Sequence, residues 1–461
     1  MRPINTEEIA QVTGGKVLYN QKPTKVKSVC INSREAKEGA LFVAIKGSRV
    51  DGHDYILDAI KRGAVAVLVE KEVEPVEDAV LILVEDNYAA LQALTRYYRK
   101  KLEIPIIALT GSSGKTTTKD IIYSVLRQKY KVHRTMGNQN NDLGVPLTIF
   151  GIEEDTEIAV VEMGMDHLGE ISHLVHMAYP DISIITNIGV THMENLKSQE
   201  NIFKAKCEIF ETLTKDQMAI VNGDDPYLST VKGEQFNVVQ IGLNKKDFPL
   251  FAHDIKSNSS GLEFTVCYNG ECKKIQFKFP GIHNVYNCLF GIYLGLHFNL
   301  TFDEIQKGLM EYFPSNNRMD IRNIKGVKII NDTYNANPDA MKAALGVLMD
   351  FKEDKGRAFA VIGDMFEIGE ESRTYHLEIG SFIAKSNKVD YLVAVGCLAK
   401  DYYNGALKNG MDPDFVYYFE NKAQAAQFLQ KNIKSEDVLL LKGSRGMFME
   451  EILETLERSS F

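Results

Sequence analysis

The sequence has no apolar run long enough to cross a bilayer. Runs such as Ala64 to Val69 are far shorter than the roughly 20 residues that a membrane-spanning helix needs. The start of the chain also lacks a charged region followed by an apolar one, and Ile4 to Ala10 is typical of a capped helix instead. We therefore expect a cytoplasmic protein with no integral membrane segment.

Long basic runs are absent as well. Lysine and arginine number 53 against 62 aspartates and glutamates, which gives a net charge of −9. This balance argues against nucleic acid as the main partner, because such partners select a basic surface. It leaves room for a locally basic site that binds a small anionic substrate.

Cysteine is sparse, with six residues in 461. Only Cys267 and Cys272 are close in sequence, and the Asn-Gly pair between them is typical of a hairpin turn. No histidine or third cysteine lies beside them in the sequence, as a metal site of this kind would need. We therefore expect reduced structural thiols without a metal site.

The chain is too long for one ordinary core, and its pattern indicates three α/β units. Short strands and turns fill residues 1–100, which predict a small α/β domain with no obvious catalytic set. Residues 101–313 predict a central ATP-binding domain with a P-loop ATPase-like parallel sheet. Residues 314–461 again alternate strands with helices, which favours a doubly wound, Rossmann-like C-terminal domain. No repeat period is found.

The strongest functional signal is the stretch 104–126. An apolar run to Leu109 predicts a buried strand, and Ile121 to Leu126 predicts a helix with one buried face. The glycine-rich turn between them lets backbone N–H groups surround a phosphate next to a helix N-terminus. In this interpretation Lys115 neutralises the outer phosphates and the Thr116 hydroxyl contacts magnesium. The alternative is an ordinary Gly/Ser turn with an exposed lysine, since Leu109 stands where the general P-loop pattern has glycine.

Polar residues follow several other predicted strands. Glu162 ends the strand that begins at Ile158, and His192 follows the strand that begins at Ile182. In open α/β sheets ligands bind beyond the carboxyl ends of the strands, so these side chains are candidates for one site. The polar loop 137–146 is a further candidate, because irregular loops of this length tend to bind ligands.

Taken in order, these motifs resemble the Mur ligases of peptidoglycan synthesis. The resemblance covers all three units and includes the phosphate loop without its leading glycine. It also includes the stretches 186–192, 205–209 and 281–287. Three further stretches are similar to the members that add D-alanyl-D-alanine: 331–338, 363–370 and 443–447.

The resemblance implies an ATP-dependent ligase that uses Mg²⁺ and joins D-Ala-D-Ala to UDP-MurNAc-tripeptide through an acyl phosphate, the last cytoplasmic step that builds the peptide. It implies that Lys206 is carbamylated and acts as a metal ligand. The implied catalytic residues are Lys115, Glu162, His192, Lys206 and Arg318, and the implied metal ligands are Thr116, Glu162, His192 and Lys206. The implied ATP-binding residues are Gly111, Ser112, Ser113, Gly114, Lys115, Thr116, Thr117, Asn284, Asn287 and Asn335.

The resemblance implies that residues 1–100 bind the uridine end of a UDP-sugar. For substrate binding it implies Ser33, Arg34, Asn138, Asn140 and Asn141. Two positions depart from the family pattern. Asn32 precedes Ser33 where relatives usually have aspartate, and Asn317 precedes Arg318 where they usually have glycine. We expect a monomer.

Two other functions remain open at this point. One is the Mur ligase that adds the third residue, whose Asp-Asn-Pro-Arg type of motif is not found here. The other is a nucleotide-dependent binding protein without ligase activity. An intact set of Glu162, His192 and Lys206 argues against the second alternative.

Overall fold

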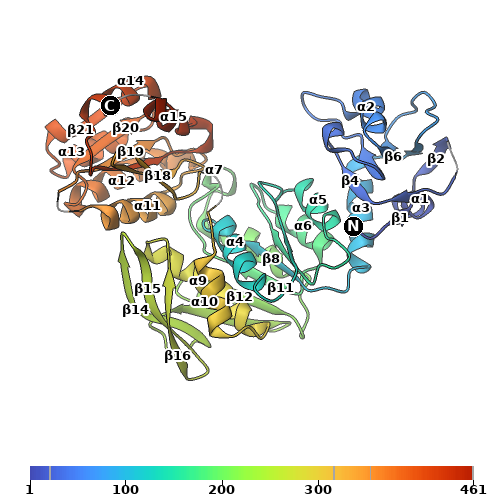
Figure 1. Ribbon diagram of the computed structural model, residues 1–461, viewed down its shortest axis with the longest axis horizontal. Helices are drawn as coiled ribbons and strands as arrows, with labels where there is room; N and C mark the ends of the chain where they lie inside the picture. Colours follow the sequence, from blue (N-terminus) through green and yellow to red (C-terminus); the bar gives the residue numbers. More distant parts are fainter. Residues whose placement is uncertain (20–21, 315–316, 354, 459–461) are drawn as a thin grey trace.

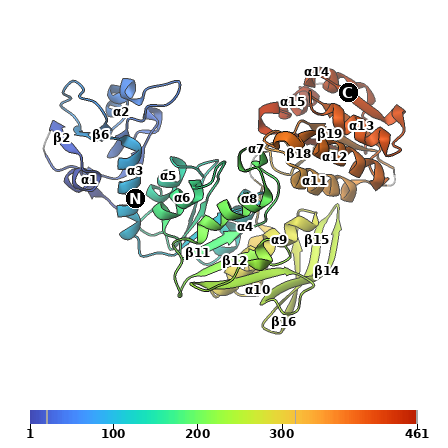
Figure 2. The ribbon, with the colours of Figure 1, turned by 180° about the vertical axis from the view of Figure 1, so that it is seen from behind.

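The computed structural model describes residues 1–19, 22–314, 317–353 and 355–458. Within these residues the strands form three sheets of five, nine and six strands, besides a two-stranded ribbon. Each large sheet has its own helices. The body that holds the N-terminus and the body that holds the C-terminus lie at opposite ends, with the nine-stranded sheet between them (Figure 1, Figure 2).

The five-stranded sheet lies in the N-terminal body. Its order is β2 (Lys16–Tyr19), β7 (Val80–Leu83), β6 (Ala64–Val69), β5 (Ala40–Val43) and β4 (Ser28–Cys30). The ribbon pairs β1 (Ile4–Asn5) with β3 (Lys25–Val26). The helices are α1 (Thr6–Thr13), α2 (Ile56–Lys61) and α3 (Asn87–Lys100). The predicted capped start at residue 5 is confirmed, because α1 opens with a capping box of Asn5 and Glu8.

The central sheet is parallel from β9 to β14 and ends in two antiparallel strands. Its order is β16 (Glu271–Phe277), β15 (Gly261–Tyr268), β14 (Leu250–Asn258), β13 (Asn237–Leu243), β12 (Met218–Asn222), β11 (Ile182–Ile185), β8 (Ile106–Thr110), β10 (Ile158–Glu162) and β9 (Val132–Arg134). The associated helices are α4 (Lys115–Leu126), α5 (Gly144–Phe150), α6 (Glu170–Ala178), α7 (Met193–Leu196), α8 (Gln199–Cys207), α9 (Ile282–His297) and α10 (Phe302–Met310).

The sequence of strand β8 is continuously apolar because both faces of the strand are buried. Ile106 and Ala108 join one buried cluster, whereas Ile107 and Leu109 join the cluster that α4 and α9 cover. A strand with helices on both faces has no solvent side, so the usual polar alternation is lost. The chain enters the phosphate loop directly from this buried strand.

The predicted hairpin at Asn269-Gly270 is confirmed, since β15 and β16 pair on either side of it. The prediction of reduced thiols is wrong for two cysteines, because the structure joins Cys267 and Cys272 in a disulfide. The reason is the register. The hairpin sets the two residues directly opposite each other, with 4.1 Å between their Cα atoms. Cys30, Cys207, Cys288 and Cys397 are free.

The C-terminal sheet is parallel except for its first edge strand. Its order is β17 (Asp320–Ile324), β18 (Val327–Asp332), β22 (Val438–Lys442), β19 (Ala358–Gly363), β20 (Tyr391–Val395) and β21 (Val416–Phe419). Its helices are α11 (Pro338–Phe351), α12 (Ser372–Ser386), α13 (Lys400–Lys408), α14 (Lys422–Asn432) and α15 (Glu450–Arg458). The mixed α/β class with parallel sheets is as predicted. The three sheets fall within 1–100, 101–313 and 314–461, and the domain bounds themselves stay a prediction.

No helix in the described part of the chain is both long enough and apolar enough to cross a membrane.

Candidate active site

The carboxyl ends of three neighbouring strands bring the predicted residues together. Strand β8 lies between β10 and β11, and Glu162 of β10 is level with Leu109 of β8. Ile185, the last residue of β11, is level with Thr110. From β8 the chain continues to β9 and β10, which lie on one side of β8 in the sheet order, and it later returns to β11 on the other side. The phosphate loop after β8 therefore lies at a topological switch point.

At one position of the phosphate loop, Gly111, only glycine fits. Gly111 has φ +152°, and a Cβ atom there would lie 1.8 Å from Oγ1 of Thr186. The loop is held from the neighbouring strand end, since the Ser113 amide donates to Oδ1 of Asn187 at 2.8 Å. Gly114 has φ +80° and is the N-cap of α4. The loop is therefore shaped before any ligand binds.

Lys115 is the first residue of α4, and its ammonium donates to the Gly111 carbonyl at 2.6 Å. Burial lowers the pKa of Lys115, while the nearby Glu162 carboxylate opposes that shift. The hydrogen bond to the Gly111 carbonyl thus places the Lys115 ammonium next to the phosphate loop. This arrangement suits an ammonium that exchanges that carbonyl for a phosphate oxygen.

Thr116 and Glu162 form an oxygen-rich pair beside the loop. Oγ1 of Thr116 donates to Oε1 of Glu162 at 3.3 Å, and Nδ2 of Asn140 donates to the same oxygen at 3.0 Å. Glu162 is 2% exposed, and its Oε2 receives no hydrogen bond. Nζ of Lys119 lies 3.5 Å from that oxygen. A hydroxyl and a buried carboxylate with a spare oxygen fit a hard cation such as Mg²⁺.

His192 precedes α7 in a left-handed conformation, with φ +59°. Its Nδ1 lies 2.9 Å from Oδ1 of Asp166 and 3.1 Å from Oε2 of Glu367, a residue of the C-terminal domain. Ligand atoms of these three residues lie within 4.8 Å of one another. The two carboxylates beside Nδ1 can orient the ring for a cation at its other nitrogen, Nε2.

Lys206 lies on α8 and is 1% exposed. Burial holds the pKa of its ammonium well below the ordinary value, and the charge of Lys115 lowers it further, against an opposing effect of Asp166. A lowered pKa favours the neutral amine, whose free electron pair can react with CO₂. The environment of Lys206 therefore favours the carbamylation that the sequence resemblance implies.

Two asparagines of α9 lie against the end of the phosphate loop and the start of α4. Oδ1 of Asn287 accepts from Thr118 at 3.0 Å and would lie 2.8 Å from a Cβ at Gly114. Nδ2 of Asn287 donates to Asn284, which is buried as well. Both asparagines also line the cavity next to the phosphate loop.

The C-terminal domain closes the other side of this cavity. Arg318 stacks over the ring of Tyr334 at 3.9 Å, and both line the cavity together with Asn335. Asn337 begins α11 and donates from Nδ2 to Oγ of Ser113 at 3.1 Å. The phosphate loop is therefore hydrogen-bonded to the domain that faces it.

The predicted substrate residues lie in three places. Of these, Asn140 lies at the site, bonded to Glu162. Asn138 and Asn141 are exposed on the loop before α5, where Oδ1 of Asn141 accepts from the Gly144 amide. Ser33 and Arg34 lie on a short 3₁₀ helix (Ser33–Glu35) of the N-terminal body and do not line the cavity.

The sequence reasoning assigned no role to Asp166, Glu367, Lys119 and Lys442. Lys119 follows Lys115 by four residues, so the helical period could have placed it on the same face of α4. Lys442 is buried in the cavity wall, where it pairs with Asp332 and donates to the Asn335 carbonyl at 2.9 Å. Asp166 and Glu367 meet at His192 from distant parts of the chain, and no local pattern marks that meeting.

Comparisons with known proteins match the whole architecture. Family profiles described as the Mur ligase family catalytic domain, the Mur ligase middle domain and the Mur ligase glutamate ligase domain match residues 25–99, 109–295 and 317–445. A Bacillus subtilis protein named UDP-N-acetylmuramoyl-tripeptide–D-alanyl-D-alanine ligase is 38% identical over 457 residues, which cover 99% of this chain and 98% of that protein. The chain belongs to the Mur ligase family.

Other relatives share this length and shape. The Escherichia coli protein of the same name is 32% identical, with 94% of each chain covered. A crystal structure of MurF from Acinetobacter baumannii superposes with a TM-score of 0.90 at 29% identity and covers 100% of both chains. MurF from Thermotoga maritima in complex with ADP gives a TM-score of 0.82 at 29% identity, with 94% of this chain and 97% of that chain covered.

Proposed function

We propose that this chain is an ATP-dependent ligase that joins D-alanyl-D-alanine to UDP-N-acetylmuramoyl-tripeptide, with release of ADP and phosphate. Two observations support the proposal. The phosphate loop and Glu162 lie at the carboxyl ends of neighbouring strands, and His192 contacts Glu367 of the C-terminal domain. The charges of Lys115 and Asp166 act on the buried Lys206. Relatives that bear this enzyme's name match over nearly the full chain.

The chemistry requires activation of a carboxylate. Joining a carboxylate to an amine in water is unfavourable, so the γ-phosphoryl group of ATP first moves to the terminal carboxylate of the tripeptide. The amine of D-Ala-D-Ala then attacks this acyl phosphate, and phosphate leaves. The first step brings two anions together, and Lys115 and Arg318 offset that repulsion from two sides of the cavity.

Magnesium would be held by two groups of residues. Thr116 and Glu162 would hold one ion beside the phosphate loop, where Glu162 offers an oxygen that receives no hydrogen bond. His192 and the carbamate of Lys206 would hold a second ion. When bound, the ions supply positive charge that stabilises the phosphoryl group during transfer.

Carbamylation would give Lys206 its role as a metal ligand. Addition of CO₂ to its neutral amine forms an N–C bond and releases one proton, which converts a side chain that repels cations into an anionic oxygen ligand. The low pKa that burial imposes on Lys206 supports this role.

The remaining assignments extend the same proposal. The N-terminal domain would bind the uridine end of the substrate through Ser33 and Arg34. Asn284, Asn287 and Asn335 would contact ADP from the cavity wall, and the enzyme would act as a cytoplasmic monomer. The contact between Asn337 and Ser113 supports closure of the C-terminal domain over the reacting groups, which protects an acyl phosphate from water.

The test is an assay of ADP release with purified chain, ATP, Mg²⁺ and UDP-MurNAc-tripeptide. We expect sustained ADP release only when D-Ala-D-Ala is present, and not with single amino acids such as diaminopimelate or lysine. ADP release that does not depend on D-Ala-D-Ala would contradict the proposal. So would ADP release with a single amino acid when UDP-MurNAc-dipeptide replaces the tripeptide. Lys115→Ala serves as the inactive control.

A further inference from the structure

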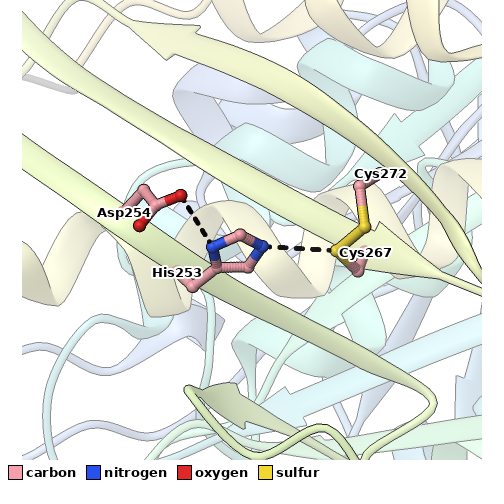
Figure 3. The surroundings of a disulfide bond; sticks show 4 residues. All are labelled: His253, Asp254, Cys267 and Cys272. Carbon is pink, nitrogen blue, oxygen red and sulfur yellow. Dashed lines mark hydrogen bonds and ion pairs between the residues drawn. A yellow bond between two sulfur atoms is a disulfide. The ribbon is translucent and has the colours of Figure 1, made fainter.

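Two cysteines and a histidine meet on the antiparallel part of the central sheet, away from the active-site cavity. Cys267 of β15 and Cys272 of β16 form a disulfide across the hairpin. His253 of the neighbouring strand β14 directs its Nε2 at Sγ of Cys267, 3.4 Å away (Figure 3). Ligand atoms of the three residues lie within 4.8 Å of one another. None of them lines the active-site cavity.

The histidine is held in a defined orientation by Asp254. Oδ2 of Asp254 lies 3.0 Å from Nδ1 of His253, on the side of the ring opposite the sulfur (Figure 3). Successive side chains on a regular strand point to opposite faces, so this contact needs an interruption of the strand. The β14–β15 register shifts between His253 and Lys256, and Asp254 has φ +51°. The bulge thus turns the carboxylate back towards the ring.

A carboxylate on Nδ1 keeps the proton there and leaves the electron pair of Nε2 free. This is the arrangement in which histidine binds a metal ion with a supporting carboxylate behind it. Two thiolates and one imidazole are a donor set that zinc prefers over magnesium or calcium. A merely structural disulfide needs neither the aligned imidazole nor its carboxylate.

We propose that in the reduced chain His253, Cys267 and Cys272 bind a zinc-class divalent cation, with Asp254 as the residue that orients the histidine. The disulfide is then the metal-free, oxidised form of the same site. Three protein ligands leave a fourth position of the tetrahedron for water or a small ligand.

Access to the site is open. The three ligands line a cleft together with Phe248, Pro249 and Phe251. Cys272 is exposed, and the side chain of His253 is 33% exposed. A cation and a reductant can therefore reach the sulfur atoms without unfolding of the sheet.

The conversion balances with a dithiol as reductant. A thiolate of the dithiol attacks one sulfur of the Cys267–Cys272 bond, and its second thiol then resolves the mixed disulfide. The dithiol leaves as its own disulfide, and the two cysteines together gain two electrons and two protons. Binding of the cation displaces those two protons. In a tetrahedral site with Zn–S bonds of about 2.3 Å, the sulfurs lie about 3.8 Å apart, which side-chain rotation can supply.

The experiment uses the full chain, reduced without oxygen by a phosphine that is then removed, and titrated with Co²⁺. We expect one equivalent of Co²⁺ to give a thiolate-to-cobalt charge-transfer absorption, and Zn²⁺ to abolish it. Cobalt at the oxygen and nitrogen ligands of the active site gives no such absorption. The oxidised chain and Cys272→Ser should lack it, whereas Cys397→Ser, which removes an exposed free cysteine, should retain it.

A second variant keeps the test independent of folding. Asp254 is 77% exposed at its side chain, so Asp254→Asn is expected to fold normally. It should weaken Co²⁺ binding by about 10-fold or more, as loss of a supporting carboxylate does at other sites. The proposal is wrong if the reduced chain shows no charge-transfer absorption, if Cys272→Ser retains it, or if Asp254→Asn binds cobalt as tightly as the parent chain. Ligase activity is assayed separately and bears on the proposed function alone.

Discussion

Nδ1 of His192 lies 3.1 Å from Oε2 of Glu367, so a residue of the C-terminal domain contacts the imidazole that is expected to bind metal in the central domain. The backbone joins the same contact, because the Glu194 amide donates to the Glu367 carbonyl at 3.3 Å. The His192 ring lowers the pKa of Glu367, which keeps this carboxylate ionised. Contacts of Glu367 thus link the C-terminal domain to the orientation of His192, the expected metal ligand.

The first prediction concerns Glu367. Glu367→Gln removes the charge that orients His192, and loss of such a supporting carboxylate typically costs about 10–100-fold in metal affinity or activity. We expect a higher Mg²⁺ concentration for half-maximal ADP release. Glu370→Gln, an exposed glutamate three residues away, is the control and should behave as the parent. An unchanged Mg²⁺ requirement in Glu367→Gln would refute the coupling.

The second prediction concerns the carbamate on Lys206. Lys206→Ala should abolish ligase activity, and short carboxylic acids such as acetate should restore part of it by filling the anionic position. Lys204→Ala, an exposed lysine on the same helix that pairs with Glu200, should remain fully active. Carbon-13 NMR of the parent chain under labelled CO₂ should show one carbamate signal that Lys206→Ala loses. Full activity of Lys206→Ala would rule out the role.

The third prediction concerns the shape of the phosphate loop. A methyl group at Gly111 would overlap Oγ1 of Thr186, so Gly111→Ala must displace the loop. We expect ADP affinity to fall at least about 10-fold, which corresponds to about 1.4 kcal/mol. Gly346→Ala is the control, because a Cβ there meets nothing within 4 Å and the residue lies within helix α11. Calorimetric titration with ADP measures both, and equal affinities would contradict the prediction.

The fourth prediction concerns pH. Burial lowers the pKa of His283 in the cavity wall to about 4, below the ordinary value of 6.5. The folded chain therefore favours the neutral ring. The stability from this preference is complete above about pH 6.5 and is lost as the pH falls from there towards 4.

His283→Gln should accordingly lose less unfolding free energy than the parent between pH 7 and pH 5. Denaturant unfolding at the two pH values measures this difference, with His173→Gln, an exposed histidine, as the control. Parallel losses in the parent and His283→Gln would show that the ring titrates normally in the fold.

Much of the fold was readable from the sequence because its signals are local. The buried strand before the phosphate loop and the hairpin at Asn269-Gly270 each follow from adjacent residues. The short apolar run from Ala64 to Val69 likewise predicts a strand, and it forms β6. The sequence predicts a helix from Pro338 to Leu348, because proline is tolerated in the first turn of a helix. The observed helix begins there and extends to Phe351, three residues further. Element boundaries are the least exact part of a prediction from sequence.

The two departures from the family pattern have a structural explanation. Asn317 has φ +59°, a left-handed conformation that glycine favours and asparagine tolerates, so Arg318 keeps its place beside the cavity. Oδ1 of Asn32 accepts from the Arg34 amide at 3.1 Å, as an aspartate oxygen could.

What the sequence did not reveal depends on long-range contacts. His253 is 14 residues from Cys267, and only the pairing of β14 with β15 brings them together. Glu367 meets His192 across a domain interface. A spacing rule cannot find such pairs, because their distance is set by sheet register and domain packing and not by separation along the chain.

In the proposed reaction the carboxylate of the tripeptide is activated by phosphoryl transfer. The decisive measurement of this step uses UDP-MurNAc-tripeptide that carries oxygen-18 in its terminal carboxylate. Mass spectrometry of the released phosphate should then find one oxygen-18 atom per phosphate, because the oxygen that accepts the phosphoryl group leaves with it. Phosphate without oxygen-18, released together with ligated product, would contradict the acyl-phosphate route.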